Sequence, residues 1–143
     1  MKKLIFSFVL INTIIGNIYS QKLDVADVPT AVKAKFTILY PRVDKVKWEK
    51  EKGNYEAEFE FKEAEKAVLI DAKGNLIYTE TKIEIEKLPK KVVDYIEKNK
   101  DGEKIKRADK VVDTAGVVSY EAELKGLDLL FDSKGNFIKE EKD

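Results

Sequence analysis

The sequence predicts an α+β fold in which two tandem repeats share one antiparallel sheet. Three observations support this prediction: an internal duplication, two proline-started segments with helical periodicity, and segments in which apolar and charged residues alternate. The chain has 143 residues, of which 43% are hydrophobic and 38% charged. It therefore has enough apolar side chains for a core and is too apolar for a disordered tail.

The duplication consists of three landmarks that occur twice in the same order. The two copies lie about 60 to 65 residues apart, and loops of different length explain the spread. Repetition at this scale predicts two copies of one small structural unit, here residues 21–86 and 87–143. The landmarks are Val-Pro at 28–29 and Leu-Pro at 88–89, Tyr-Glu-Ala-Glu at 55–58 and 120–123, and Asp-x-Lys-Gly-Asn at 71–75 and 132–136.

The N-terminus, 1–20, is predicted to be a secretory signal peptide. Lys2 and Lys3 are followed by an apolar run, 4–15, and then by a short segment that ends at Ser20. The run is shorter than the roughly 18 apolar residues of a membrane-spanning helix, and no Cys follows it for lipid attachment. We therefore expect cleavage near Ser20, a periplasmic or secreted protein, and no stable membrane anchor. A retained N-terminal anchor is the alternative.

Each repeat is predicted to begin with an amphipathic helix. Pro29 and Pro89 stand at the expected helix starts, where a missing N–H does no harm because it would have no partner there. Tyr40-Pro41 marks the end of the first helix. The residues expected to face the core are Val32, Phe36 and Leu39 in the first helix and Val92, Tyr95 and Ile96 in the second.

Antiparallel strands are predicted after each helix. Over 55–62 and 120–125, apolar side chains alternate with Glu and Lys, which is the period of a strand with one buried face. Two further strands are expected over 43–49 and 77–85. The residues expected in the core are Phe36, Trp48, Tyr55, Phe59, Ile70, Tyr120 and Phe131.

The two Asp-x-Lys-Gly-Asn segments predict hairpin turns, in which Gly74 and Gly135 adopt positive φ. A calcium loop is the alternative, but the segments lack the ligand series and the terminal Glu of an EF-hand. No Gly- or Ser-rich linker separates the repeats at 84–90. We therefore expect one continuous, curved sheet with both helices packed on its apolar face.

The absent residue types exclude several functions. Without Cys and His the chain has no disulfide framework, no thiolate nucleophile, no Ser-His-Asp triad and none of the preferred ligands of zinc or copper. Removal of 1–20 takes away Lys2 and Lys3 and no acid, which leaves a net charge of about −2. This near balance argues against binding to nucleic acids or to anionic membranes. No cofactor and no metal is expected.

Paired carboxylates are the best candidates for catalysis. Glu56 and Glu58 lie on one face of a strand, about 6.7 Å apart at Cα from the rise per residue. This overlaps the carboxyl separation of inverting glycosidases, but every Glu-x-Glu strand produces it. A glycosidase also needs a cleft that raises the pKa of its acid, and both glutamates are expected on a solvated face. We therefore predict that the protein is not an enzyme.

Together these features resemble those of the PepSY-like family of small exported bacterial proteins, described as β-lactamase-inhibitor-like. The resemblance covers about residues 24–141. It implies a unit of one helix and about four antiparallel strands, repeated in tandem so that an eight-stranded sheet curves around two helices. It also implies an architecture similar to that of the β-lactamase inhibitory protein, which binds an enzyme through its open sheet face. The family carries no established catalytic residues.

The expected function is that of an exported binding or inhibitory module. Its expected partner is an unidentified envelope or secreted protein, and the chain is expected to be a monomer. The open face is expected to be charged, unlike the aromatic binding face of the inhibitory protein, which favours a weaker, salt-sensitive contact with a basic partner. The alternative is an envelope sensor that binds a small ligand or a cation loosely. The residues expected on the face are Lys47, Glu49, Glu56, Glu58, Glu60, Glu121, Glu123 and Lys125.

Overall fold

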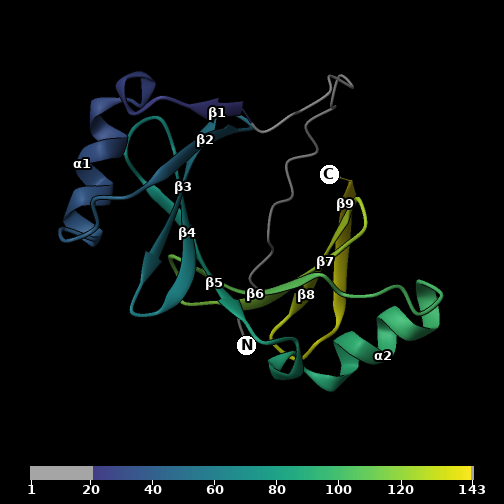
Figure 1. Cartoon of the computed structure of the whole chain (residues 1–143). Coiled ribbons are helices and arrows are strands. Elements are labelled where there is room, and N and C mark those ends of the chain that lie inside the picture. Colours follow the sequence, from purple (N-terminus) through teal and green to yellow (C-terminus); the bar gives the residue numbers. More distant parts are fainter. Residues whose placement is uncertain (1–20, 143) are drawn as a thin grey trace, which may run out of the picture.

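The computed structural model describes residues 21–142 as one antiparallel sheet with two helices on one side of it (Figure 1). The signal peptide predicted over 1–20 lies outside the described residues. No helix within 21–142 is long and apolar enough to cross a membrane. The strands follow one another across the sheet in chain order. They are β1 (Gln21–Leu23), β2 (Lys47–Glu51), β3 (Asn54–Phe61), β4 (Ala64–Ile70), β5 (Leu76–Ile83), β6 (Arg107–Asp113), β7 (Val118–Leu124), β8 (Leu127–Asp132) and β9 (Phe137–Lys142).

The two α-helices lie at opposite ends of the sheet, on the outer side of its bend (Figure 1). Each follows a proline, as predicted. The Pro29 carbonyl accepts a hydrogen bond from the Val32 N–H (3.0 Å), and the Pro89 carbonyl accepts one from the Val92 N–H (2.9 Å). The prolines therefore stand immediately before the first helical residue. The helical elements are η1 (Val25–Asp27), α1 (Thr30–Leu39), η2 (Ile85–Lys87) and α2 (Lys90–Asn99).

The hydrophobic core is divided into two clusters, one beneath each helix. β5 connects them, because Leu76 packs against the first cluster and Ile83 against the second. One strand thus contributes side chains to both clusters, so the repeats are joined directly without a linker. The first cluster contains Val28, Val32, Phe36, Trp48, Ala57, Phe59, Val68 and Ile70, and the second contains Leu88, Val92, Ile96, Ile105, Ala108, Ala122, Leu124, Leu129 and Phe131.

Aromatic side chains fill much of the first cluster. Phe36 of α1 makes edge-to-face contacts with Trp48 and Phe59, with ring centroids 5.5 and 5.0 Å apart. Leu39, which was predicted to face the core, is instead 37% exposed. Tyr40 takes the place beside Phe59, with ring centroids 4.4 Å apart, because the chain leaves the helix there and turns its ring inward.

The predicted core is confirmed except at two tyrosines. Trp48, Phe59 and Phe131 are buried, as are the other aliphatic and phenylalanine positions of the prediction. Tyr55 and Tyr120 are half-buried and pack at the margins of the two clusters. The phenolic hydroxyl explains their position, because a tyrosine at the edge of a core buries its ring and keeps its polar end in contact with water.

Strand boundaries differ from the prediction in three places. The strand expected over 43–49 begins at Lys47, and Val43 and Val46 pack against the first cluster ahead of it. The strand expected over 77–85 ends at Ile83, since Ile85 enters η2 and covers the second cluster. The unpredicted β1 pairs with β2 and makes nine strands instead of eight. Three residues are too few for alternation to reveal it.

The two Asp-x-Lys-Gly-Asn segments form hairpin turns, as predicted. In the first, Asp71 Oδ1 accepts hydrogen bonds from the backbone N–H groups of Lys73 and Asn75, both at 2.9 Å. The Asn75 side-chain amide also donates to Asp71 Oδ2 (2.9 Å), and these bonds lower the pKa of Asp71. The turn at Asp132 repeats the arrangement. Both carboxylates thus have their partners inside the turns.

Gly74 is expected to tolerate no side chain. Its φ is +87°, and an added Cβ would lie 2.7 Å from the Ala31 carbonyl oxygen of α1. We expect Gly74→Ala to lower the free energy of unfolding by about 2–4 kcal/mol, through backbone strain and overpacking. Gly53 is the matched control: its φ is +84° and no atom lies within 4 Å of an added Cβ, so Gly53→Ala should cost only about 1–2 kcal/mol. Urea titrations measure both, and equal losses would contradict the close helix contact.

Candidate functional site

The open face is the side of the sheet that the two helices leave uncovered. In β3, Tyr55, Ala57 and Phe59 point toward the helices. Glu56 and Glu58 between them point the other way, because successive side chains of a strand alternate, and the antiparallel register extends this alternation across the sheet. The open face lines the inner side of the bend (Figure 1). Its charged residues are Lys22, Lys47, Glu49, Glu51, Glu56, Glu58, Glu60, Glu65, Glu80, Lys82, Arg107, Asp109, Asp113, Glu121, Glu123, Asp128, Lys139 and Glu141.

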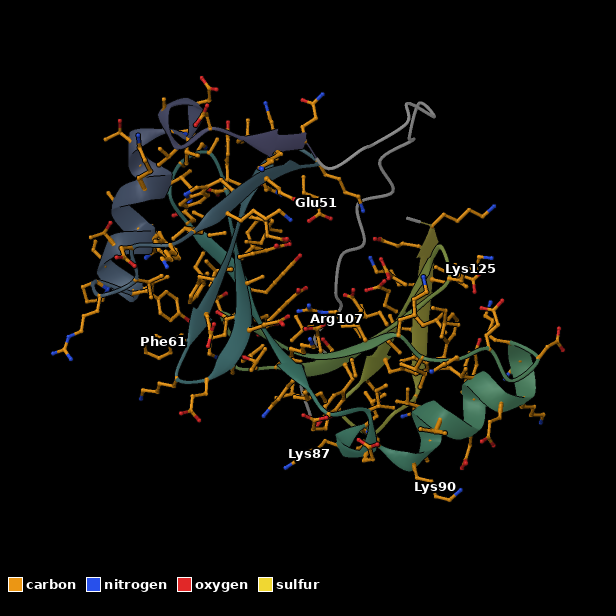
Figure 2. All side chains as sticks on the ribbon, in the orientation of Figure 1. Glu51, Phe61, Lys87, Lys90, Arg107 and Lys125 are labelled. Carbon is orange, nitrogen blue, oxygen red and sulfur yellow. The ribbon has the colours of Figure 1, made fainter. Side chains whose placement is uncertain are left out.

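Every residue predicted for this face lies on it except Lys125. Lys125 follows the last residue of β7 and is exposed in the turn to β8, where the alternation of the strand has ended. Figure 2 shows it away from Glu51 and Arg107, which lie on the inner side of the bend. Glu60 is exposed near the end of β3, and Glu123 pairs in register with Arg107.

The first-repeat part of the predicted site is held by cross-strand contacts. The register places Lys47 opposite Glu58 and Glu49 opposite Glu56. Lys47 Nζ lies 2.6 Å from the Glu49 carboxylate and 3.1 Å from that of Glu58. Hydrogen bonds to these two carboxylates raise the pKa of Lys47. The structure therefore brings these four predicted residues together on two adjacent strands.

Glu56 differs from the solvated carboxylate that the alternation predicted. It is half-buried, and burial raises its pKa to about 8, with further contributions from the charges of Glu51 and Glu58 and from a hydrogen bond with Glu51. The surroundings of Glu56 therefore favour its protonated form more than those of an ordinary surface glutamate do. The sequence pattern could assign Glu56 to a face, but it could not predict how much of that face the bend would bury.

Glu80 is a central residue of the open face that the sequence analysis missed. It lies on β5, between Ala67 of β4 and Val111 of β6 in the register. Burial raises its pKa to about 9, and the charges of Glu121 and Glu56 add to the effect. These two glutamates belong to different repeats, so acids from both halves of the sheet interact electrostatically with Glu80.

The signal that could have identified Glu80 was present in the strand pattern. In the strand expected over 77–85, alternation puts Thr79 and Thr81 on the side of the apolar Ile77 and Ile83, which leaves Tyr78, Glu80 and Lys82 for the open face. Burial also raises the pKa of Tyr78, and the charge of Glu80 raises it further. Tyr78 is the aromatic residue that the strands of 21–142 contribute to this face.

Glu121 occupies, in the second repeat, the position that Glu56 occupies in the first. It is half-buried on β7, opposite Asp109 of β6. Burial is the largest cause that raises its pKa, to about 7, and the charges of Asp128, Asp109 and Glu51 also raise it. Glu51 lies on β2, so the sheet bends enough for strands that are far apart in its order to interact electrostatically.

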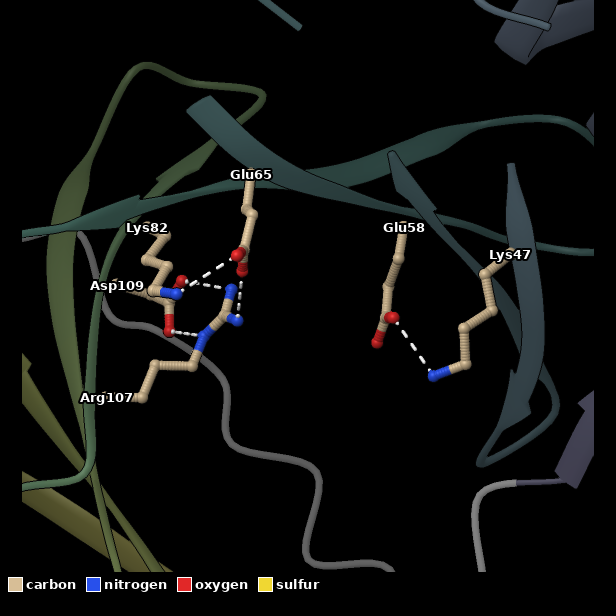
Figure 3. A network of polar contacts seen from close by, with 6 residues as sticks. All are labelled: Lys47, Glu58, Glu65, Lys82, Arg107 and Asp109. Carbon is tan, nitrogen blue, oxygen red and sulfur yellow. Dashed lines mark hydrogen bonds and ion pairs between the residues drawn. The ribbon is translucent and has the colours of Figure 1, made fainter. Parts of the chain in front are cut away.

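Arg107 organises the ion pairs between the two repeats (Figure 3). Its guanidinium donates to both oxygens of Asp109 (2.7 and 2.8 Å) and to the Glu65 carboxylate (2.9 Å). Lys82 Nζ also donates to Glu65 (3.0 Å). The hydrogen bonds to Asp109 raise the pKa of Arg107 further above its usual value. Because Asp109 is 5% exposed, this bidentate pair is the most buried ionic contact of the face.

A second ion pair connects the ends of the sheet. Lys52, in the turn between β2 and β3, lies 3.0 Å from the Glu141 carboxylate of β9. Lys139 lies 2.6 Å from the same carboxylate. Together these contacts lower the pKa of Glu141, with the Lys139 hydrogen bond the largest cause. The bend therefore brings the first and the last parts of the sheet into contact.

Three carboxylates of the open face could together hold a cation. Glu49, Glu56 and Glu58 each offer one oxygen, and these oxygens all lie within 4.8 Å of one another. Carboxylate oxygens are the ligands that Ca²⁺ and Mg²⁺ prefer. Lys47 already contacts Glu49 and Glu58, so a cation would compete with its ammonium group.

Glu56 and Glu58 meet only one requirement of a glycosidase pair. Burial does raise the pKa of Glu56. Two open pockets of the described part of the chain lie elsewhere: one of about 300 Å³ beside α2 and one of about 460 Å³ beside β1. Glu56 and Glu58 line neither of them, so neither pocket supplies the cleft that a glycosidase pair needs.

Solved structures with the same fold come from Bacteroides. The chain matches one of the "putative periplasmic proteins" of Bacteroides eggerthii DSM 20697 with a TM-score of 0.67 and 15% identity, over 80% of this chain and 88% of that chain. It matches a DUF2874 family protein of Bacteroides uniformis ATCC 8492 with a TM-score of 0.62 and 20% identity, over the same shares of each chain. No protein of curated function matches.

A BLIP-like protein of Bacteroides fragilis NCTC 9343 also matches, with a TM-score of 0.59 and 24% identity, over 80% of this chain and 86% of that chain. At these identities the likeness concerns the fold. The family model described as "Putative beta-lactamase-inhibitor-like, PepSY-like" matches twice, over 17–78 and 67–139, which fits tandem repeats. The resemblance inferred from the sequence is thereby confirmed, and the chain belongs to the PepSY-like family of β-lactamase-inhibitor-like proteins.

Proposed function

We propose that this protein is an exported, non-enzymatic binding module that docks a partner protein through its open face. The observation that carries the proposal is the face on the inner side of the bend, which neither helix covers (Figure 1) and to which strands of both repeats contribute charged residues. The family description and the BLIP-like neighbour are consistent with a binding role. The repeating unit in this proposal is one helix followed by four strands.

The composition of the face favours a salt-sensitive contact over tight inhibition. Carboxylates outnumber ammonium and guanidinium groups there, and Tyr78 is its aromatic contribution within 21–142. Tight interfaces depend on buried aromatic and arginine anchors, whereas charged surfaces govern association rate and specificity. We therefore favour an envelope or secreted partner bound by charge, with the module acting as a periplasmic monomer.

Affinity capture with a charge-reversed bait tests the docking function. The protein is immobilised and exposed to envelope extract of its native cell at low and at physiological salt. We expect it to retain a partner that is lost when Glu56, Glu58, Glu121 and Glu123 are all replaced by Lys. The matched control reverses the same number of charges outside the open face, at Glu84, Glu86, Glu97 and Glu103, and should retain the partner.

Two results would count against the docking function. Retention of the same proteins by both variants would remove the open face from the interaction. Retention of nothing at either salt concentration would remove the docking function itself. Circular dichroism of each variant confirms that loss of binding is not loss of folding.

Cation binding is a second candidate function, because the oxygens of Glu49, Glu56 and Glu58 lie within 4.8 Å of one another. A cation bound by the folded state alone raises the melting temperature by mass action. Addition of millimolar Ca²⁺ or Mg²⁺ should then raise the melting temperature of the native protein and leave that of a Glu49→Gln, Glu56→Gln, Glu58→Gln variant unchanged. An unchanged melting temperature of the native protein would remove this candidate.

A further inference from the structure

The centre of the open face holds three acids that no cation of the described chain neutralises. Glu56, Glu80 and Glu121, here called the central acids, lie on β3, β5 and β7 and therefore connect the two repeats. Each is half-buried, and the charges that act on it come from other carboxylates. No lysine or arginine within 21–142 forms an ion pair with any of the three.

Four of the five cations of the surrounding face are engaged in ion pairs, and the fifth, Lys22, lies on the edge strand β1 opposite Glu49. Lys47 pairs with Glu49 and Glu58, Lys82 pairs with Glu65, and Lys139 pairs with Glu141. Arg107 is held by two hydrogen bonds to Asp109 and a third to Glu65. Moving any of these four toward the central acids would break an existing ion pair, and Lys22 forms no ion pair with them, so compensation is expected from outside residues 21–142.

We propose that the occupant of the open face is a lysine- or arginine-rich segment of the partner protein, whose cationic side chains reach the central acids. This inference rests on the docking function proposed above and adds the chemistry of the partner. A concave surface on which one sign of charge predominates, as acids do here, concentrates the electric field and accelerates association with the opposite charge. An extended basic segment fits because the central acids are spread over β3 to β7.

Binding of such a segment is coupled to proton release. Burial and neighbouring acids raise the pKa of Glu56 to about 8, of Glu80 to about 9 and of Glu121 to about 7, so at neutral pH the central acids together hold more protons than ordinary glutamates do. A cation beside a carboxyl favours its ionised form, so its arrival displaces the proton. The affinity for a basic segment must therefore increase as pH rises.

Other charged groups of the face surround the central acids and enter the same equilibrium. Glu56 faces Glu49, Glu51 and Glu58. Glu80 faces Tyr78 and Lys82 on its own strand, Glu65 on β4, and Asp109 and Asp113 on β6. Glu121 faces Asp109, Glu123, Asp128 and Glu141. Acids predominate around all three, which favours the protonated forms of their carboxyls until a cation arrives.

Fluorescence anisotropy with a synthetic basic peptide tests the proposal. The probe is a labelled twelve-residue peptide rich in Lys and Arg, and its counterpart has every cation replaced by Gln. At constant, physiological ionic strength we expect the native protein to bind the basic peptide about tenfold more tightly at pH 8.5 than at pH 6.5. The Gln peptide should not bind. Calorimetry in buffers of different ionisation enthalpy should detect the released protons.

Two variants assign the effect to the central acids. Glu56→Gln, Glu80→Gln and Glu121→Gln in one chain remove the titrating groups, so this variant should bind weakly at both pH values. The control replaces Glu84, Glu86 and Glu97 by Gln, which removes the same number of acids outside the face and should preserve both the affinity and its pH dependence. Circular dichroism verifies that both variants fold.

Several outcomes would overturn the proposal. These are an affinity that does not change with pH, a triple variant that binds as the native protein does, and displacement of the peptide by micromolar Ca²⁺, which would identify the face as a cation site. If the native partner is still captured through the open face while the basic peptide fails to bind, the docking function stands and this inference falls. If the basic peptide binds as expected and no partner is captured, the docking function falls although the site exists.

Discussion

Replacing Phe59 by Ala is expected to lower the free energy of unfolding by about 3–5 kcal/mol. Phe59 is 7% exposed and lies between α1 and the sheet. Its ring contacts Phe36 edge-to-face and also packs against Tyr40. Truncation removes these contacts and leaves a cavity that the aromatic neighbours, held by the helix and by β2, can fill only in part.

Urea denaturation measures the free energy of unfolding of Phe59→Ala and of a control variant, Ile38→Ala. Ile38 lies on the same helix-bearing side of the first repeat but is 76% exposed, so its truncation should change the free energy of unfolding by less than about 0.5 kcal/mol. A loss below about 1 kcal/mol for Phe59→Ala would contradict the assignment of Phe59 to the core.

Replacing Glu80 by Gln is expected to stabilise the protein at pH 8 by about 2 kcal/mol and to leave its stability unchanged near pH 4. The folded state raises the pKa of Glu80 to about 9, whereas an unfolded chain leaves it near the usual value for Glu. Between these values the folded protein holds the extra proton, so the free energy of unfolding falls as pH rises from about 4.5 to 9. Gln is uncharged at every pH in this range, so its side chain causes no such fall in the free energy of unfolding.

The size of the Glu80 effect is limited by its neighbours. Glu56 and Glu121 share the same surroundings, so removal of one carboxyl leaves part of the repulsion between the others in place. The control is Glu86→Gln, an exposed acid of η2 that should show no comparable pH dependence. Thermal denaturation from pH 4 to pH 9 measures both. A destabilised Glu80→Gln at pH 8, or a native protein that gains stability over this range, would contradict the prediction.

If Glu80 and its neighbours lower stability at neutral pH, their presence needs an explanation in function. Half-buried acids without a cation are unfavourable in the free protein. A basic partner would relieve that cost on binding, and the same groups would then contribute to affinity. Stability and binding are thus expected to respond in opposite directions to Glu-to-Gln changes at the centre of the open face.

Much of the fold could be predicted from the sequence because its signals are local. Alternation over 55–62 assigned each side chain of β3 to one face, and the Asp-x-Lys-Gly-Asn segments contain the hydrogen-bonding groups that close their own turns. The helix starts follow from proline chemistry. Errors arose where a tertiary contact overrides the local pattern, as at Leu39, which Tyr40 displaces from the core.

The candidate site was predictable in part for the same reason. Alternation placed Glu56 and Glu121 on the open face, and it also contained Glu80, whose position between the threonines of β5 was available but unused. The pattern failed at Lys125, because a turn begins where the alternation was extended by one residue. It could not show that acids of different repeats would interact.

The sequence by itself determined the two repeats, the strand faces, the hairpin turns and the membership of a family, since each depends on residues that are close together in the chain. Only the tertiary structure decided how the open face behaves. The bend of the sheet brings Lys52 to Glu141 and lets Glu51 act on Glu121, although these residues are distant in the chain. Burial within that bend, and not residue type, raises the pKa of Glu56, Glu80 and Glu121 above the usual value for Glu. Curvature depends on the register and packing of the whole sheet, so no local pattern contains it.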